Sequence, residues 1–250
     1  MWLKDRVVLI TGGSRGIGRA TALRLAQERP AHILIVYALD HAAARSTVQQ
    51  IERLGVAASA ICADVGKEEE LRRMFEEISR SHPRLDVFIN NAARASFGPL
   101  MEMSARNWRK IGDLNATAFL LGAQLAAGMM PEGGRMIALS SLGSRDCLPQ
   151  YGALGVNKAA IECLVRYLAV ELAPRSIRVN AVCAGFVDTD GTRLMENYEG
   201  VAAAVAQRTP AGRIARPEDI AAVVALLCSS DADWIQGQTI VADGGYSLLR

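Results

Sequence analysis

The sequence predicts a single α/β domain built on a parallel, doubly wound sheet of seven strands. Short apolar runs alternate with helical patterns along almost the whole chain, and the apolar runs are continuous rather than alternating with polar residues. No linker, repeat or low-complexity segment divides the 250 residues. A strand that is buried on both faces has a continuous apolar sequence, and alternating strands and helices give a parallel sheet covered on both sides.

Seven apolar segments are predicted as strands: 6–10, 32–37, 56–62, 85–89, 134–140, 176–183 and 237–242. Helices are predicted between them over 16–29, 41–54, 67–82, 104–129, the stretch that contains Lys158, and 217–229. The least regular region, about 184–216, follows the carboxyl end of a strand, where open α/β sheets bind ligands. A long excursion at that place predicts a substrate lid.

Charge and composition exclude several classes of partner. The 28 Lys and Arg residues nearly balance the 26 Asp and Glu residues, which gives no electrostatic basis for binding nucleic acid or an anionic membrane. The sequence has no run of 18 apolar residues and no signal-peptide pattern, so we expect a soluble, cytoplasmic protein. The three histidines are far apart in the sequence, so we expect no metal site.

The segment "TGGSRGIG" places four glycines, Gly12, Gly13, Gly16 and Gly18, between the first predicted strand and the first helix. Glycine allows a tight turn and a close approach of the backbone to a pyrophosphate, whose charge then meets the free N–H groups of the helix N-terminus. The position at the first strand-to-helix junction therefore predicts a dinucleotide site.

These glycines, "NNAA" at 90–93, a serine after the fifth strand and a Tyr/Lys pair on a helix together resemble the short-chain dehydrogenase/reductase family. The resemblance covers the whole chain down to "GQTIVADGG". It implies a Rossmann fold with seven parallel strands and a homotetramer. It also implies that Asp64 contacts the adenine, that Asn90 lies near the ribose, and that Val187 and Thr189 meet the nicotinamide. The full set of implied cofactor-binding residues is Gly12, Ser14, Arg15, Gly16, Ile17, Gly18, Asp64, Val65, Asn90, Lys158, Gly185, Val187 and Thr189.

The catalytic tyrosine departs from the family pattern Tyr-x-x-x-Lys, because Leu154 stands four residues before Lys158. Tyr151 is the tyrosine nearby, at a spacing of seven. Seven residues advance a helix by almost two turns, so both side chains share a face, with their Cα atoms about 10 Å apart. Tyr151 must therefore lie in the first turn or just before it, where Gly152 and Gly155 permit an irregular backbone. A nearby ammonium is expected to lower the pKa of a tyrosine, and in the family the lysine also binds the nicotinamide ribose.

The family alignment makes Ser141 the residue that hydrogen-bonds the substrate oxygen, with Ser140 as the second candidate. The family's assisting asparagine falls at Asp113 on gapless counting, and Asn115 follows two residues later. We assign neither residue a catalytic role from the sequence.

The choice between the two nicotinamide cofactors depends on the ribose 2′ position, where an acidic residue after the second strand favours NADH and a basic residue favours NADPH. No carboxylate stands at Tyr37 or Ala38, and Arg15 is placed to meet a 2′-phosphate. Asp40 favours the opposite choice. The sequence thus predicts NADPH, with NADH as the less favoured cofactor.

The spacing Tyr-x6-Lys and segments such as "LGVNKAAIE", "RYLAVELAP" and "TPAGR" resemble enoyl-[acyl-carrier-protein] reductase III. This resemblance implies NADPH-dependent reduction of a trans-2-enoyl thioester, carried on acyl carrier protein or coenzyme A, in fatty acid or polyketide biosynthesis. Two alternatives stay open. One is a reductase of 3-ketoacyl thioesters or other carbonyls, and the other is a non-catalytic cofactor-binding relative, suggested by Leu154 and Asp113.

Overall fold

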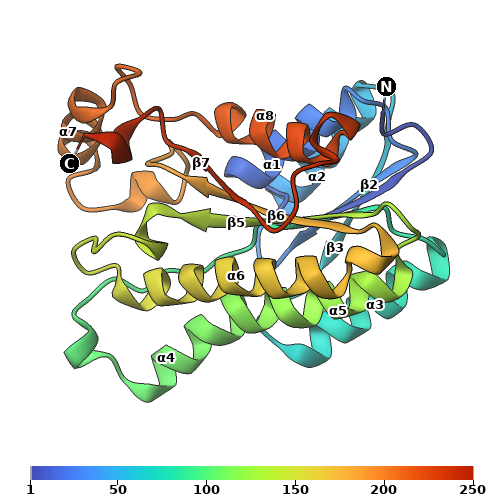
Figure 1. The fold of residues 1–250 in the computed structure, drawn as a ribbon, viewed down its shortest axis with the longest axis horizontal. Helices are drawn as coiled ribbons and strands as arrows, with labels where there is room; N and C mark the ends of the chain where they lie inside the picture. The colour runs from blue at the N-terminus through green and yellow to red at the C-terminus, as the bar shows by residue number, and fades with distance from the viewer. Residues whose placement is uncertain (1, 250) are drawn as a thin grey trace.

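A computed structural model describes residues 2–249 and contains one seven-stranded sheet in which all strands are parallel. The strand order is β3-β2-β1-β4-β5-β6-β7, so the chain winds outward from β1 in one direction and then returns to continue in the other (Figure 1). The point where the winding reverses lies between β1 and β4, and open sheets of this kind bind ligands at the carboxyl ends of these strands. The predicted doubly wound fold is confirmed.

Each strand begins and ends within two residues of its prediction. The strands are β1 (Val7–Thr11), β2 (His32–Tyr37), β3 (Ala57–Cys62), β4 (Val87–Asn90), β5 (Arg135–Ser141), β6 (Arg178–Ala184) and β7 (Thr239–Ala242). Both faces of the sheet are covered. In β1, Val7 and Leu9 pack into one hydrophobic core, whereas Val8 and Ile10 pack into the other.

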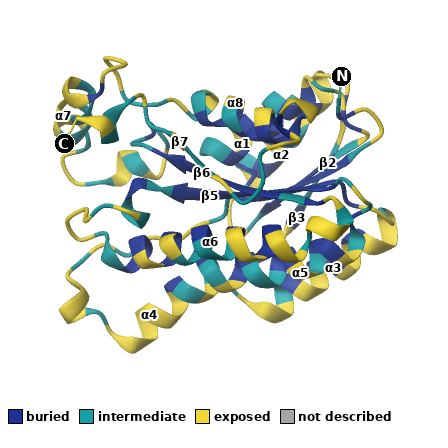
Figure 2. Ribbon diagram, in the orientation of Figure 1, coloured by how far each residue is buried: buried dark blue, intermediate teal, exposed yellow. Residues whose placement is uncertain are grey.

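Helices form a layer on each side of the sheet (Figure 1). One layer consists of α1 (Gly16–Ala26), α2 (His41–Arg53) and α8 (Pro217–Cys228). The other contains α3 (Glu68–Ser81), α5 (Ala118–Met129) and α6 (Gly152–Glu171). The central strands and the inward faces of these helices are buried, whereas the edge strands β3 and β7 are partly exposed (Figure 2).

The helix predicted over 104–129 is not one regular helix. It consists of α4 (Ala105–Gly112), a π-helical turn (Asp113–Thr117) and α5. A π turn inserts one extra residue into the helix and is frequent at functional sites. The insertion turns Asn115 into the protein, where it is completely buried, whereas Asp113 stays partly exposed on the surface.

The predicted lid region contains a short 3₁₀ turn (Thr192–Leu194) and α7 (Tyr198–Arg208). None of the residues of α7 is buried, and the helix projects from one end of the molecule (Figures 1 and 2). Polar contacts fasten the segment at its start, where Asp188 accepts hydrogen bonds from Arg193 and from the Tyr198 hydroxyl. Backbone contacts fasten its end, where Ala211 N–H donates to the Gly244 carbonyl.

Across residues 2–249, no helix combines the length and the apolar character needed to cross a membrane. Within the same range, no three His, Cys, Asp or Glu side chains are grouped so that they could hold a metal ion.

Candidate active site

The glycine turn after β1 combines a left-handed backbone conformation with close backbone packing, and both favour glycine. Gly12 has a φ of +65°, and a Cβ at Gly18 would collide with the Gly12 carbonyl oxygen. Asn91, just after β4, donates its side-chain amide to the carbonyls of Thr11 and Gly12 at 2.9 and 3.0 Å. The amide thereby ties the carboxyl ends of β1 and β4 together and fixes the turn.

The N-terminus of α1 is arranged to receive an anion. No side chain among residues 2–249 caps it, and its first turn contains no acidic residue. Arg15 precedes the helix in an extended conformation and is exposed, while Ser14 is buried and accepts a hydrogen bond from Thr47 through its carbonyl. Backbone N–H groups and the helix dipole favour a negative ligand at such an end. The turn and the helix end therefore fit the pyrophosphate of a dinucleotide, with Gly16 and Ile17 in the first helical turn.

Residues after β3 and at the end of β4 lie at the same carboxyl edge of the sheet as the glycine turn. The Asp64 carboxylate accepts a hydrogen bond from Gly66 N–H, and the Asp64 N–H donates to Glu70, so Asp64 is held in a fixed turn just after β3. Val65 is buried beside it, and Asn90 is the last residue of β4 and also buried.

The segment after β6 follows the carboxyl end of the sheet on the other side of β1 and β4. Gly185 packs so closely on the backbone of Asp243 that a Cβ would lie 2.9 Å from the Asp243 Cα. Val187 pairs with Ala215 in an isolated parallel bridge and is buried. The Thr189 methyl group lies 3.5 Å from where a Cβ on Gly16 would stand. Of the predicted nicotinamide-side residues, the structure thus brings Thr189 next to Gly16 at the start of α1.

Tyr151 lies immediately before α6, as the spacing of seven predicted. Gln150 has a φ of +59°, a left-handed conformation that turns the chain into the helix. The Tyr151 hydroxyl donates to Ser141 Oγ at 3.0 Å. Its ring packs so tightly on Gly143 that a side chain there would collide with it, and a Cβ on Gly155 would lie 2.5 Å from the Gly143 carbonyl oxygen. Small residues in both elements therefore let α6 and the end of β5 approach closely enough to form the pair.

Ser140, the second serine candidate, points away from this pair. Its hydroxyl donates to Glu162 Oε1 at 2.6 Å, on the opposite side of the strand from Ser141. Ser141 is consequently the serine that faces Tyr151.

Lys158 is buried, with 5% of its surface exposed, and its ammonium donates to the Leu139 carbonyl at 2.7 Å. Burial lowers the pKa of Lys158 to about 8. Burial also raises the pKa of Tyr151, and the hydrogen bond to Ser141 offsets part of that rise. The prediction that Lys158 lowers the pKa of Tyr151 is therefore wrong for this structure, because the lysine bonds to the strand carbonyl and desolvation disfavours the phenolate.

Asn115 is a candidate that the sequence did not assign. Its amide donates to the carbonyls of Ile111 and Arg94 at 2.8 and 3.0 Å, whereas its Oδ1 atom is buried with no hydrogen-bond partner among residues 2–249. A buried acceptor without a partner is costly and usually meets water or ligand. The signal in the sequence was a lone amide in the apolar run "NATAFLL".

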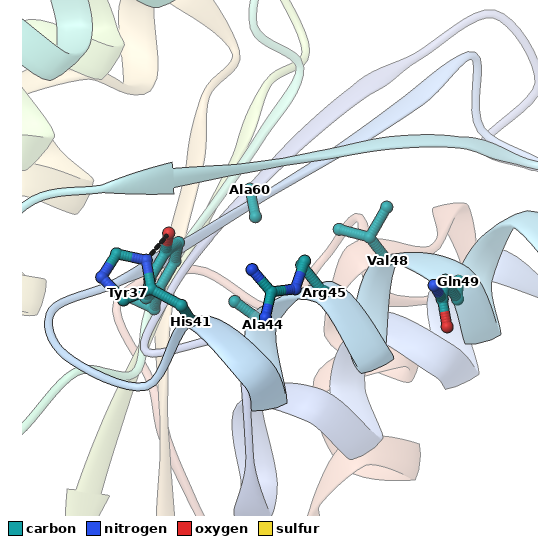
Figure 3. A pocket seen from close by; sticks show the side chains of 7 residues that line it. All are labelled: Tyr37, His41, Ala44, Arg45, Val48, Gln49 and Ala60. Carbon is teal, nitrogen blue, oxygen red and sulfur yellow. Dashed lines mark hydrogen bonds between the residues drawn. The ribbon is translucent and has the colours of Figure 1, made fainter.

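Two hollows in the surface of residues 2–249 lie near the carboxyl edge of the sheet, and Tyr151 lines neither of them. One, of about 670 Å³, is lined by Arg145, Arg213 and Asp243 among others. The other, of about 440 Å³, lies between α2 and the edge strand β3 (Figure 3). There Tyr37 hydrogen-bonds His41 at 2.8 Å, with Arg45 beside them.

Comparisons with known proteins agree with this arrangement. A family model described as Enoyl-(Acyl carrier protein) reductase matches residues 12–247. The chain is 41% identical over 248 residues to 1-cyclohexenylcarbonyl-CoA reductase of Streptomyces collinus, a match that covers 98% of this chain and 88% of that protein. It is also 34% identical over 259 residues to the hydroxynaphthalene reductase-like protein Arp2 of Metarhizium brunneum, covering 97% of this chain and 95% of that protein.

Solved structures show the same fold over nearly the entire length. The promiscuous reductase LugOII, which catalyses keto-reduction at C1 during lugdunomycin biosynthesis, superimposes with a TM-score of 0.91 at 34% identity, covering 98% of this chain and 99% of that one. The angucycline C-6 ketoreductase LanV, solved with bound NADP, gives 0.92 at 32% identity, covering 99% and 97%. The chain therefore belongs to the short-chain dehydrogenase/reductase family and is an NAD(P)H-dependent oxidoreductase.

Proposed function

We propose that the protein reduces a trans-2-enoyl thioester with NADPH. The observation that carries the proposal is the position of Tyr151, which stands before α6, two turns from Lys158, and donates to Ser141. Because the chain belongs to an oxidoreductase family, a carbonyl reductase is the second candidate. A non-catalytic relative is no longer proposed.

The residues of the cofactor cleft support NADPH over NADH. Arg15 is exposed beside the glycine turn and is free of any ion pair within residues 2–249, so it is available to a 2′-phosphate. Asp40, which favoured NADH in the sequence, accepts a hydrogen bond from Ala43 N–H at 2.9 Å and caps α2. A carboxylate used as a helix cap is less available to a ribose hydroxyl. NADPH bound here would supply the hydride that reduces the β-carbon.

The chain's own residues would stabilise the charge that develops on the thioester oxygen. Burial keeps the Tyr151 phenol protonated at neutral pH, since the pKa is raised rather than lowered. A neutral phenol is a hydrogen-bond donor, and donors aimed at a developing oxyanion stabilise the transition state. The Tyr151 hydroxyl would turn its one proton from Ser141 Oγ, 3.0 Å away, to that oxyanion, and Ser141 would donate a second hydrogen bond. Lys158 would hold the nicotinamide ribose.

Apolar side chains surround Tyr151 and suit an acyl group. The Phe97 ring lies 6.1 Å from the Tyr151 ring, and 52% of its surface is exposed. Leu100 packs against Gly152, and Leu148 lies near Gly143. Partly exposed apolar groups at the mouth of a site favour a substrate with an apolar body.

The similar proteins divide between the two candidates. The relative from Streptomyces collinus acts on an enoyl-CoA by its name, whereas LugOII and LanV are ketoreductases. Leu154, which occupies the usual tyrosine position and is buried, favours the enoyl candidate for this chain. We propose a coenzyme A or acyl-carrier-protein thioester as the substrate, in fatty acid or polyketide biosynthesis in the cytoplasm.

The segment 184–216 is proposed as the substrate lid. Because α7 has no buried residue, the helix can move without disrupting a core. The contacts at Asp188 and Ala211 keep the ends of the segment attached to the rest of the protein.

A homotetramer is proposed from the outer face of α6. Val156, Tyr167 and Val170 share one face of that helix, and their exposed fractions are 48%, 67% and 75%. An exposed apolar stripe of this kind favours burial against another subunit.

The test is a comparison of Tyr151→Phe with Tyr167→Phe, a control on α6 whose side chain is 67% exposed and whose ring, the part proposed for the subunit contact, is kept. Loss of one oxyanion donor is expected to lower kcat for an enoyl thioester about 100-fold, with the Kd for NADPH unchanged. Full activity of Tyr151→Phe would refute the role proposed for the phenol.

A further inference from the structure

A buried carboxylate on α6 connects the helix to the strand that carries Ser141. Glu162 is 6% exposed and stands four residues after Lys158 on the same helix. Its Oε1 atom accepts hydrogen bonds from the hydroxyls of Ser140 and Ser144, each at 2.6 Å. Its Oε2 atom accepts from Arg145 Nε at 3.2 Å. All three hydrogen bonds found for this carboxylate within residues 2–249 thus come from one short segment of the chain.

That segment, Leu139–Arg145, contains the partners of both proposed catalytic side chains. The Leu139 carbonyl accepts from Lys158, and Ser141 Oγ accepts from Tyr151. Ser140 and Ser144, which Glu162 holds, flank Ser141 on both sides. Fixing the two flanking hydroxyls to α6 also fixes where Ser141 stands relative to the helix that carries Tyr151.

We infer that Glu162 is a positioning residue, which acts by clamping residues 140–145 to α6 so that Ser141 Oγ faces the Tyr151 hydroxyl. The inference rests on the proposed function, since it assigns Ser141 and Tyr151 to the same reaction. Glu162 does not touch the reacting atoms, because its carboxylate faces Ser140, on the other side of β5 from Ser141.

A carboxylate suits this task better than an amide. One oxygen accepts two hydroxyl donors while the other accepts the guanidinium of Arg145, so all three partners are donors. Glutamine would replace one of these oxygens by an NH₂ group, which is itself a donor and cannot accept a hydrogen bond from Arg145. Glu162→Gln therefore keeps the volume of the side chain but removes one side of the clamp.

The first test is a double-mutant cycle with Ser141→Ala, using whichever thioester the wild-type enzyme reduces. Glu162→Gln alone is expected to lower kcat about ten-fold, the size of one lost charge-assisted hydrogen bond, with the Kd for NADPH changed less than about two-fold. In the Ser141→Ala background the same substitution is expected to lower kcat less than about two-fold, because the residue through which it acts is already absent. If the double variant loses kcat by the product of the two single-variant factors, the substitutions act independently and the inference is overturned. Glu171→Gln, at the exposed end of the same helix, is the control.

The second test needs no substrate. In protein labelled with ¹³Cζ-tyrosine, the Tyr151 resonance is identified by its loss in Tyr151→Phe. Glu162→Gln is expected to shift it in the same direction as Ser141→Ala, and an unchanged resonance would overturn the inference. If wild-type protein reduces no thioester, the proposed function fails while this measurement still decides the role of Glu162. If Glu162→Gln does not fold, Ser144→Ala removes one of the two hydroxyl donors, and the same shift of the resonance is expected.

Discussion

Replacing Lys158 by methionine is expected to change how the free energy of unfolding depends on pH. In the folded protein burial lowers the pKa of this ammonium from 10.5 to about 8. Between these two values the unfolded chain binds more protons than the folded one, so the wild-type protein gains stability as pH rises. Below pH 8 the lysine is charged in both states, and this gain is absent. Methionine has a similar length and does not titrate.

The magnitude follows from the two pKa values. A difference of one pKa unit corresponds to about 1.4 kcal/mol, so the lysine should contribute about 2.5 kcal/mol of increasing stability between pH 7 and pH 10. The difference in unfolding free energy, Lys158→Met minus wild type, should fall by this amount over the same range. The Leu139 carbonyl loses its donor in the variant, which adds a destabilising offset at every pH.

The assay is urea unfolding at a series of pH values, for wild type, Lys158→Met and a control, Lys110→Met. Lys110 is exposed on α4, and the control curve should stay parallel to wild type. A Lys158→Met curve parallel to wild type would refute the reasoning, because it would mean that the buried lysine keeps its ordinary pKa in the folded state.

Three further predictions concern the cofactor cleft and the tyrosine position. Gly18→Ala places a methyl group against the Gly12 carbonyl and should destabilise the protein by about 1–3 kcal/mol in urea unfolding. It should also weaken NADPH binding, and an unchanged Kd would contradict the role of the glycine turn in binding the cofactor. Arg15→Ala should raise the Kd for NADPH about ten-fold, the loss of a charged hydrogen bond to phosphate, and leave the Kd for NADH unchanged; equal effects on both cofactors would contradict the 2′-phosphate role. Leu154→Tyr should increase reduction of a ketone relative to an enoyl thioester, and a ratio of rates that does not move would show that a phenol at position 154 cannot reach the substrate.

The sheet and the position of Tyr151 could be predicted from the sequence because each follows from a local, periodic property. Strands buried on both faces have continuous apolar sequences, and β1, β4 and β5 show this directly. The spacing of seven placed Tyr151 at the start of α6, since a regular helix fixes which residues share a face.

Features that depend on contacts between distant residues could not be predicted. The π turn at 113–117 leaves the apolar pattern almost unchanged, so the long helix showed no interruption and Asn115 went unassigned. The lowered pKa of Lys158 depends on burial under other elements. The partners of Glu162 lie 17 to 22 residues away in the sequence, and its spacing from Lys158 indicates only a shared helix face.

The measurement that tests the central claim most directly is NADPH oxidation by the purified protein, with crotonyl and acetoacetyl thioesters compared under identical conditions. Because Tyr151 stands seven residues before Lys158 and burial keeps its phenol protonated, we expect NADPH oxidation with the crotonyl thioester and little with the acetoacetyl thioester. Oxidation with the acetoacetyl thioester alone would contradict the account and identify a ketone reductase with an altered tyrosine position.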